Sequence, residues 1–299
     1  MIRINLSQKI KDDFYHSITK LFEGNFSKTE DKKQIWSIEY KELDALVQKK
    51  LKSFDANISF EKLIRADYTY IQELVKFISK NPKRYELSSK EKDYFLTLYK
   101  RLKKADLIKQ LEVAVCPYCN RNYIFNFSKN NQQNATAQLD HFFDKKSYPY
   151  LAVTLYNLVP SCATCNQRKS SKQENIFYPY KESFNDSAKF RYSINSISDI
   201  SLEIESLKEH EKVKTHIELF NLQNLYNEHK DIIHELILKR EIYPDSYIDE
   251  LLQEYEGTFF NNREDVLRLI TCGYVEDKDL SKRPLSKLIK DISEELELI

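Results

Sequence analysis

The stretch CATCNQRK, Cys162 to Lys169, holds a cysteine pair followed directly by an amide side chain and two cations. A second pair with the same C-x-x-C spacing occurs earlier, in the stretch CPYC from Cys116 to Cys119. Four thiolates from two such pairs form a closed tetrahedral zinc site, which is structural because no position is left for water. Two redox-active pairs or an iron–sulfur cluster are the alternatives. The spacing predicts a zinc site that clips two distant segments together.

The composition of the 299-residue chain favours an ordered, helix-rich protein, and its length suits one large domain or two ordinary ones. Aromatic residues make up 13% of the chain and only 3 glycines occur, a mixture that is unusual for a β-sandwich. We therefore expect a mainly α protein with a small α+β module around the cysteine pairs.

The sequence carries no targeting or membrane signal. No apolar run approaches the roughly 18 to 20 residues that cross a bilayer, and the first residues lack the apolar core of a signal peptide. We expect a cytoplasmic protein with no membrane partner, and in that compartment cysteine pairs indicate metal before disulfide. The fifth cysteine, Cys272, is expected to be a small buried core residue.

Apolar spacing and composition divide the chain into three predicted regions. Residues 1–112 show helical spacing with a break at Asn81-Pro82, and residues 113–182 gather both cysteine pairs and four of the seven prolines. Residues 183–299 alternate as a β-hairpin around Asn195 to Asp199 and then return to helical spacing. Within the middle region, residues 128–138, SKNNQQNATAQ, are predicted to form a polar loop.

Charge is unevenly distributed although the net charge is only +1. From Lys76 to Lys109 eleven lysines and arginines face four acidic residues, whereas Glu241 to Ile299 has seven against fifteen. A basic stretch of this kind is compatible with nucleic acid, and it is equally typical of solvated helix faces. The charge pattern supports a nucleic-acid hypothesis without establishing it.

Polar residues of a kind that perform hydrolysis lie inside or beside the loop that the cysteine pairs enclose. Asp140 and His141 are adjacent, so on an extended segment one could bind a metal while the other addresses a different group. If a helix begins near Cys165, Asn166 and Lys169 share a face, where an amide oxygen suits a hard cation and an ammonium suits a phosphate. Each residue also has an ordinary explanation: a turn for the Asp-His pair and for Asn157, a helix cap for Asn166, solvated charge for Arg168 and Lys169.

The order D-H, N-L-x-P and C-x-x-C-N-x-x-K resembles the ββα-metal motif of the HNH endonucleases over about residues 116–172. The resemblance implies two strands and a helix that hold one divalent cation at a phosphodiester. It assigns Asp140 and Asn166 to the catalytic metal, His141 to the general base, and Asn157 to bracing the loop that bears the histidine. Relatives often have proline three residues after the histidine, where this chain has Asp144.

The stretches CPYCNRNYI, LDHFFDKKSYPYL and YNLVPSCATCN resemble more narrowly the HNH effector subunits of bacterial anti-phage systems of the Septu and retron-associated type, which pair with an ATPase. We therefore expect an endonuclease that acts on nucleic acid, with DNA favoured over RNA, and an ATPase subunit as a partner. Oxygen ligands favour Mg²⁺ or Mn²⁺ over zinc at the catalytic position. Arg168, Lys169 and Lys172 are the expected contacts to flanking phosphates, by charge and not by base reading.

Two other functions remain open at this level. The first is a zinc-clipped nucleic-acid-binding module without catalysis, which requires the Asp-His pair to be accidental. The second is an interaction subunit whose helical ends and acidic tail dock a partner. The other five histidines, His16, His210, His216, His229 and His234, are expected to be ordinary surface or core residues.

Overall fold

The computed structural model describes residues 2–23, 39–196 and 199–299, and helices dominate it. The helices are Gln8–Glu23 (α1), Tyr40–Leu51 (α2), Phe60–Arg65 (α3), Tyr68–Lys80 (α4), Ser89–Arg101 (α5), Lys104–Gln110 (α6), Ala163–Lys169 (α7), His210–Phe220 (α8), Leu222–Asn227 (α9), Lys230–Ile242 (α10), Asp245–Tyr255 (α11), Arg263–Thr271 (α12) and Ser286–Glu295 (α13). The expectation of a mainly α protein is confirmed. No helix within the described ranges is both long enough and apolar enough to span a bilayer.

Within the described residues, six strands form three separate antiparallel pairs. The strands are Asn126–Lys129 (β1), Gln132–Ala135 (β2), Gln138–His141 (β3), Leu158–Ser161 (β4), Ala188–Ser196 (β5) and Asp199–Ser206 (β6). In the pair β3–β4, Asp140 lies opposite Val159 and His141 opposite Leu158. Helix α7 follows β4 directly and packs against β3, so residues 138–169 run strand, strand, helix.

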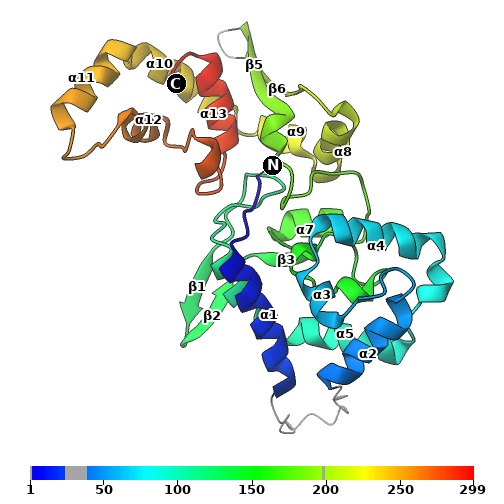
Figure 1. Cartoon of the computed structure of the whole chain (residues 1–299). Helices are drawn as coiled ribbons and strands as arrows, with labels where there is room; N and C mark the ends of the chain where they lie inside the picture. The colour runs from blue at the N-terminus through cyan, green and yellow to red at the C-terminus, as the bar shows by residue number, and fades with distance from the viewer. Residues whose placement is uncertain (1, 24–38, 197–198) are drawn as a thin grey trace.

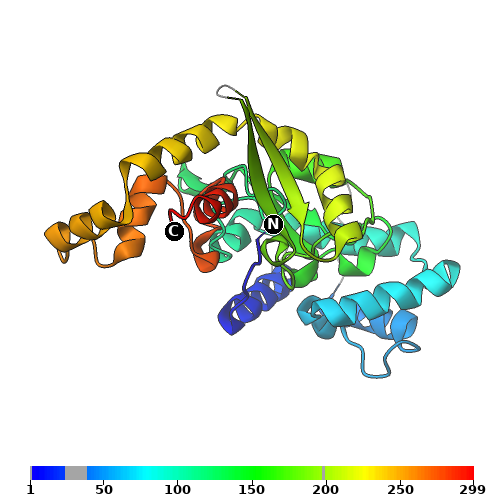
Figure 2. The same cartoon turned by 90° about the horizontal axis from the view of Figure 1, so that it is seen from above.

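The N-terminal and C-terminal parts of the chain form two halves of the molecule (Figure 1). Helices α1 to α5 gather with β3 and α7 in the lower half of the view, and β5, β6 and α8 to α13 occupy the upper half. Seen from above, the hairpin β5–β6 lies between α13 on one side and α8 and α9 on the other (Figure 2).

The predicted helix break and the predicted hairpin are both confirmed. Helix α4 ends at Lys80, and Pro82 opens a single 3-10 turn, because proline fits the first position of a helix but cannot continue one. The hairpin pairs Phe190 with Ile204 and Tyr192 with Leu202. Residues 197–198 of its predicted bend, and residues 24–38 of the predicted N-terminal helical region, lie outside the described part of the chain.

Two predictions are wrong. Residues 128–138 are not a loop, because β1 and β2 form a hairpin there, closed by Asn130 and Asn131 with φ of 52° and 59°. Asparagine tolerates this left-handed conformation, and the polar strands lack the apolar alternation that would have revealed them. Cys272 is exposed and has a φ of 56°, so it ends helix α12 at the surface and does not fill the core.

Candidate functional site

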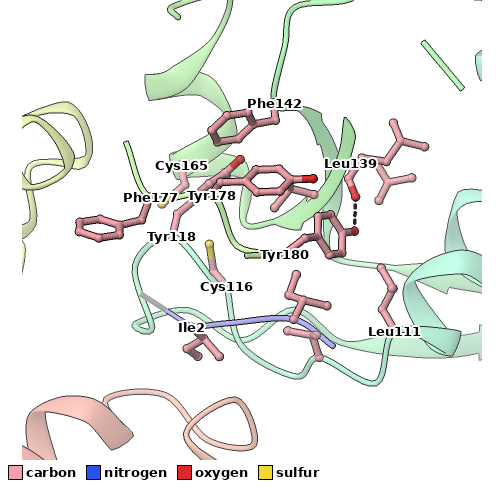
Figure 3. Close-up of a cluster of buried hydrophobic side chains, with 14 of the residues drawn as sticks. Ile2, Leu111, Cys116, Tyr118, Leu139, Phe142, Cys165, Phe177, Tyr178 and Tyr180 are labelled. Carbon is pink, nitrogen blue, oxygen red and sulfur yellow. Dashed lines mark hydrogen bonds between the residues drawn. The ribbon is translucent and has the colours of Figure 1, made fainter. Parts of the chain in front are cut away.

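The four paired cysteines converge on one buried point. The sulfur atoms of Cys116, Cys119, Cys162 and Cys165 all lie within 4.8 Å of one another, and all four thiols are free and buried. A tetrahedral zinc ion with Zn–S bonds of about 2.3 Å holds its sulfurs about 3.8 Å apart. The cluster is therefore close to the geometry that a single zinc ion needs. Figure 3 shows Cys116 and Cys165 reaching this point from two segments, with Tyr118 alongside.

Hydrogen-bond donors around the cluster suit thiolates. The backbone N–H of Arg121 donates to Sγ of Cys119 at 3.4 Å, and the amide Nδ2 of Asn122 donates to Sγ of Cys162 at 3.3 Å. Donors aimed at sulfur stabilise its ionised form and orient it toward a metal. The donor set and its surroundings therefore fit a structural zinc ion, which could be held by these four residues.

Tyr118, between the first two cysteines, connects the cluster to Asp140. Its hydroxyl donates to Oδ2 of Asp140 at 2.7 Å, its ring is fully buried, and it stacks on Phe220 with ring centroids 4.9 Å apart. Because Tyr118 lies between Cys116 and Cys119, it links the cysteine cluster directly to the carboxylate of Asp140.

Lys169 is the second partner of Asp140. Its ammonium lies 3.1 Å from Oδ2 of Asp140, and it donates to the carbonyl oxygen of His141 at 2.9 Å. Only 1% of Lys169 is exposed. Burial raises the pKa of Asp140, while Lys169 and Tyr118 act in the opposite direction. The expected phosphate contact of Lys169 is corrected: helix α7 directs this side chain inward, where it neutralises Asp140.

His141 points away from this pair, as the alternation of a strand requires. Its Nε2 lies 3.0 Å from the carbonyl oxygen of Ala152, and its ring packs edge-on against Tyr99. A carbonyl oxygen only accepts, so Nε2 carries the proton and Nδ1 keeps its lone pair. Burial lowers the pKa of His141 to about 3, so the ring is neutral at ordinary pH.

Asn157 holds the segment that follows His141. Its Oδ1 accepts from the N–H of Phe143 at 2.7 Å, and its Nδ2 donates to the carbonyl oxygens of Phe143 and Leu151. Asp144, three residues after His141, accepts two hydrogen bonds from Ser147 and closes a turn. The hydrogen bonds of Asn157 and Asp144 therefore order the loop after His141 without a proline.

A cavity of about 410 Å³ brings several predicted residues together. Asn166 reaches it from α7, with its amide nitrogen 2.5 Å from Oε1 of Gln138. Lys104 and Lys145 also line the cavity, and each ammonium lies over the ring of Tyr99, at 4.2 and 4.3 Å from its centre. The lining residues are Tyr99, Lys104, Ala137, Gln138, Leu139, Asp140, His141, Asp144, Lys145, Asn166 and Ser170.

Sequence reasoning missed Tyr118, Lys104 and the cavity role of Lys145. The knuckle position of Tyr118 was visible in the sequence, but its contact with Asp140 spans 22 residues and has no local signal. Two further residues were predicted to contact phosphates. Arg168 lies in the last turn of α7 and Lys172 lies three residues after its end, and neither lines the cavity. Lys172 is exposed and Arg168 half-buried.

Comparison with known proteins finds a similarity over part of the chain. The chain is 31% identical over 72 residues to the Septu protein PtuB of Bacillus thuringiensis. The match covers 23% of this chain and 28% of the relative, so the two proteins share a segment and not their full lengths. No family model matches the sequence, and no solved structure matches the fold.

Proposed function

We propose that the chain is a metal-dependent endonuclease of the HNH class that hydrolyses phosphodiester bonds in nucleic acid, with DNA favoured over RNA. The observation that carries the proposal is the cavity in which Asp140, His141 and Asn166 meet at the junction of β3, β4 and α7. A strand pair and a helix that present these three residues at one cavity are what a ββα-metal site would need, and this supports the proposal.

His141 supplies the proton acceptor in this proposal. Because Nε2 is bonded to Ala152, Nδ1 is the free basic atom, and it takes a proton from a water molecule as that water attacks phosphorus. Burial keeps the ring uncharged at neutral pH, so Nδ1 needs to lose no proton first, although the same low pKa makes it a weaker base than a solvated imidazole. Asn157 and the turn at Asp144 hold the following segment and thereby limit movement of the ring.

Asp140 and Asn166 are the proposed holders of the catalytic cation. Mg²⁺ or Mn²⁺ fits a site of one carboxylate and one amide oxygen, and such an ion supplies positive charge where charge develops on the phosphate and the leaving oxygen. Tyr118 and Lys169 orient the carboxylate of Asp140 from behind. Lys104 and Lys145, which line the cavity, replace Lys169 as the proposed phosphate contacts.

The test is cleavage of supercoiled plasmid and of single-stranded substrates in the presence of Mg²⁺ or Mn²⁺. His141→Ala should lower the rate by about two to four orders of magnitude, because a positioned general base contributes about that much. His234→Ala is the matched control, since His234 is exposed on α10. If His141→Ala cleaves as fast as the wild type, His141 is not the base.

We further propose that the protein acts as an effector in anti-phage defence together with an ATPase subunit. The support is the similarity to a Septu protein over part of the chain. Co-expression with the product of a neighbouring ATPase gene, followed by size-exclusion chromatography, tests the pairing. Two separate elution peaks would remove the ATPase from the proposal.

A non-catalytic, zinc-clipped nucleic-acid-binding module is the second candidate. The observation in its favour is that Asp140 already has two buried partners, Tyr118 and Lys169, so that its charge is balanced within the protein. Binding of nucleic acid without cleavage across Mg²⁺, Mn²⁺ and other divalent ions would favour this candidate over the nuclease.

A further inference from the structure

Three aromatic side chains form an exposed row beside the hairpin β1–β2. Tyr123, Phe125 and Phe127 are 43%, 49% and 46% exposed, whereas Ile124 between the first two is buried. Residues at alternate positions of an extended segment share one face. The rings of Tyr123 and Phe125 stack with centroids 4.4 Å apart and planes at 22°. Phe127 is the next alternate position, so three exposed aromatic residues follow one another along this face, and exposed aromatic side chains that gather in this way are candidates for a binding surface.

Backbone pairing holds this aromatic row in place. The N–H of Phe125 donates to Oγ1 of Thr136 and the N–H of Thr136 donates to the carbonyl oxygen of Phe125, each at 2.8 Å. Phe127 lies opposite Asn134 in the hairpin, and both strands pack on α6. The rings therefore project from an ordered backbone. Little conformational entropy of the protein is lost when a ligand stacks on them.

The strand segment beside the aromatic residues leads along the chain to a residue that lines the cavity of His141. Thr136, the pairing partner of Phe125, precedes Gln138 by two residues. Gln138 lines the cavity, and its Oε1 accepts from the amide of Asn166. The partner of Phe125 is thus only two residues along the chain from the edge of the cavity where Asn166 and Gln138 meet.

The charges near the row suit a polyanion. Residues 100–129 contain seven lysines and arginines against two acidic residues. Lys104 lines the cavity, while Lys103 and Lys109 are exposed. The hairpin itself, residues 126–135, has amide side chains and one lysine but no carboxylate. A surface that binds a single strand has aromatic rings that stack on base faces and cations that contact phosphates. Amide side chains can in addition form hydrogen bonds with base edges.

We propose that Tyr123, Phe125 and Phe127 are a base-stacking platform that binds an unpaired nucleic-acid strand and directs it into the cavity of His141. The proposal rests on the nuclease function and specifies its substrate class as single-stranded or locally unpaired nucleic acid. Base faces are covered inside a duplex, so only unpaired bases can stack on exposed rings.

The experiment measures binding in the His141→Ala background, so that no substrate is consumed. Fluorescence anisotropy compares a labelled single strand, as DNA and as RNA, with a duplex of the same sequence. The double substitution Phe125→Ala and Phe127→Ala should weaken single-strand binding at least about tenfold and change duplex binding less than twofold. Phe125→Trp should keep single-strand affinity, because its ring still stacks.

Phe259→Ala is the matched control, since Phe259 is a 74% exposed phenylalanine elsewhere in the molecule. Unchanged single-strand affinity in the double variant would overturn the platform. Equal losses for single strand and duplex would overturn the substrate class. If the single strand binds through the row but wild-type protein cleaves nothing, the nuclease proposal fails and the platform stands. If the wild-type protein cleaves but the double variant binds the single strand normally, the platform proposal fails and the nuclease proposal stands.

Discussion

Asp140 and Lys169 form an ion pair that is almost wholly removed from solvent, with side-chain exposures of 3% and 2%. Such a pair adds little net stability, because desolvation offsets the attraction between the charges. Removing one partner is different, since the other charge is left buried and uncompensated. Burial raises the pKa of Asp140, whereas Lys169 and Tyr118 both lower it.

Lys169→Met should lower the free energy of unfolding by about 3 to 5 kcal/mol and reduce cleavage. Lys172→Ala, at an exposed position, should change the free energy of unfolding by less than about 0.5 kcal/mol. Urea unfolding of both variants measures the difference. A phosphate contact would behave in the opposite way, with normal stability and a higher KM that depends on salt.

Tyr118→Phe removes one hydroxyl and tests how Asp140 is oriented. Loss of a hydrogen bond to a ligand carboxylate typically weakens metal affinity about 10- to 100-fold. Cleavage measured against Mn²⁺ concentration should show this shift in half-saturation. Tyr150→Phe, which loses a buried hydroxyl bonded to the carbonyl of Tyr85, is the control. Equal Mn²⁺ dependence in both variants would contradict the role of Tyr118.

Helix α7 combines two tasks within seven residues. Cys165 faces the sulfur cluster, and Asn166, one residue later, faces Gln138 and the cavity. Its short length gives it little stability of its own, because helix formation in isolated segments this short is unfavourable. The cysteine cluster therefore determines where α7 begins and how Asn166 is presented.

Cys116→Ser and Asn166→Ala should separate these two tasks. The wild type should contain about one zinc ion per chain by elemental analysis, and Cys116→Ser should lose the ion together with the fold of residues 113–182, because binding energy of structural zinc is folding energy. Asn166→Ala should keep its zinc and its circular dichroism but lose cleavage. A well-folded wild-type protein without zinc would refute the structural site.

The first cysteine pair also anchors the C-terminal half of the molecule. Asn120, buried and with a φ of 51°, bonds through its side chain to Leu280 and Lys287 and through its carbonyl to Leu285. Helices α8 and α9 reach the same pair, since the ring of His216 bonds to the carbonyl of Tyr118 and Tyr226 donates to the carbonyl of Cys119. Loss of metal should therefore loosen α8 to α13 as well as the module.

His216 should make the stability of the folded protein depend on pH. Burial lowers its pKa well below the ordinary value of 6.5. Below about pH 6.5 the unfolded chain therefore binds a proton that the folded chain does not, so stability falls as pH falls. Between pH 7.5 and 5.5 the loss from this group should be about 1.4 kcal/mol. His216→Gln should remove that part in urea unfolding at constant zinc; parallel pH profiles would contradict it.

Local sequence patterns were sufficient for the helical character of the chain, the helix break before Pro82, the β5–β6 hairpin and the grouping of the four cysteines. They failed at residues 128–138, because a polar hairpin closed by two asparagines has no apolar alternation. The catalytic assignments of Asp140, His141 and Asn166 stay predictions, although these residues do share one cavity.

The sequence by itself determined which chemical groups are present and how they are spaced: two cysteine pairs, an Asp-His pair and an amide beside the second pair. Only the tertiary structure decided that Lys169 turns inward to Asp140, that Tyr118 joins the cysteine cluster to the carboxylate, and that Lys104 and Lys145 stand at the cavity. The reason is physical. Periodicity and spacing follow from the local geometry of the backbone, whereas the direction of a buried charge depends on partners that folding brings together from distant segments.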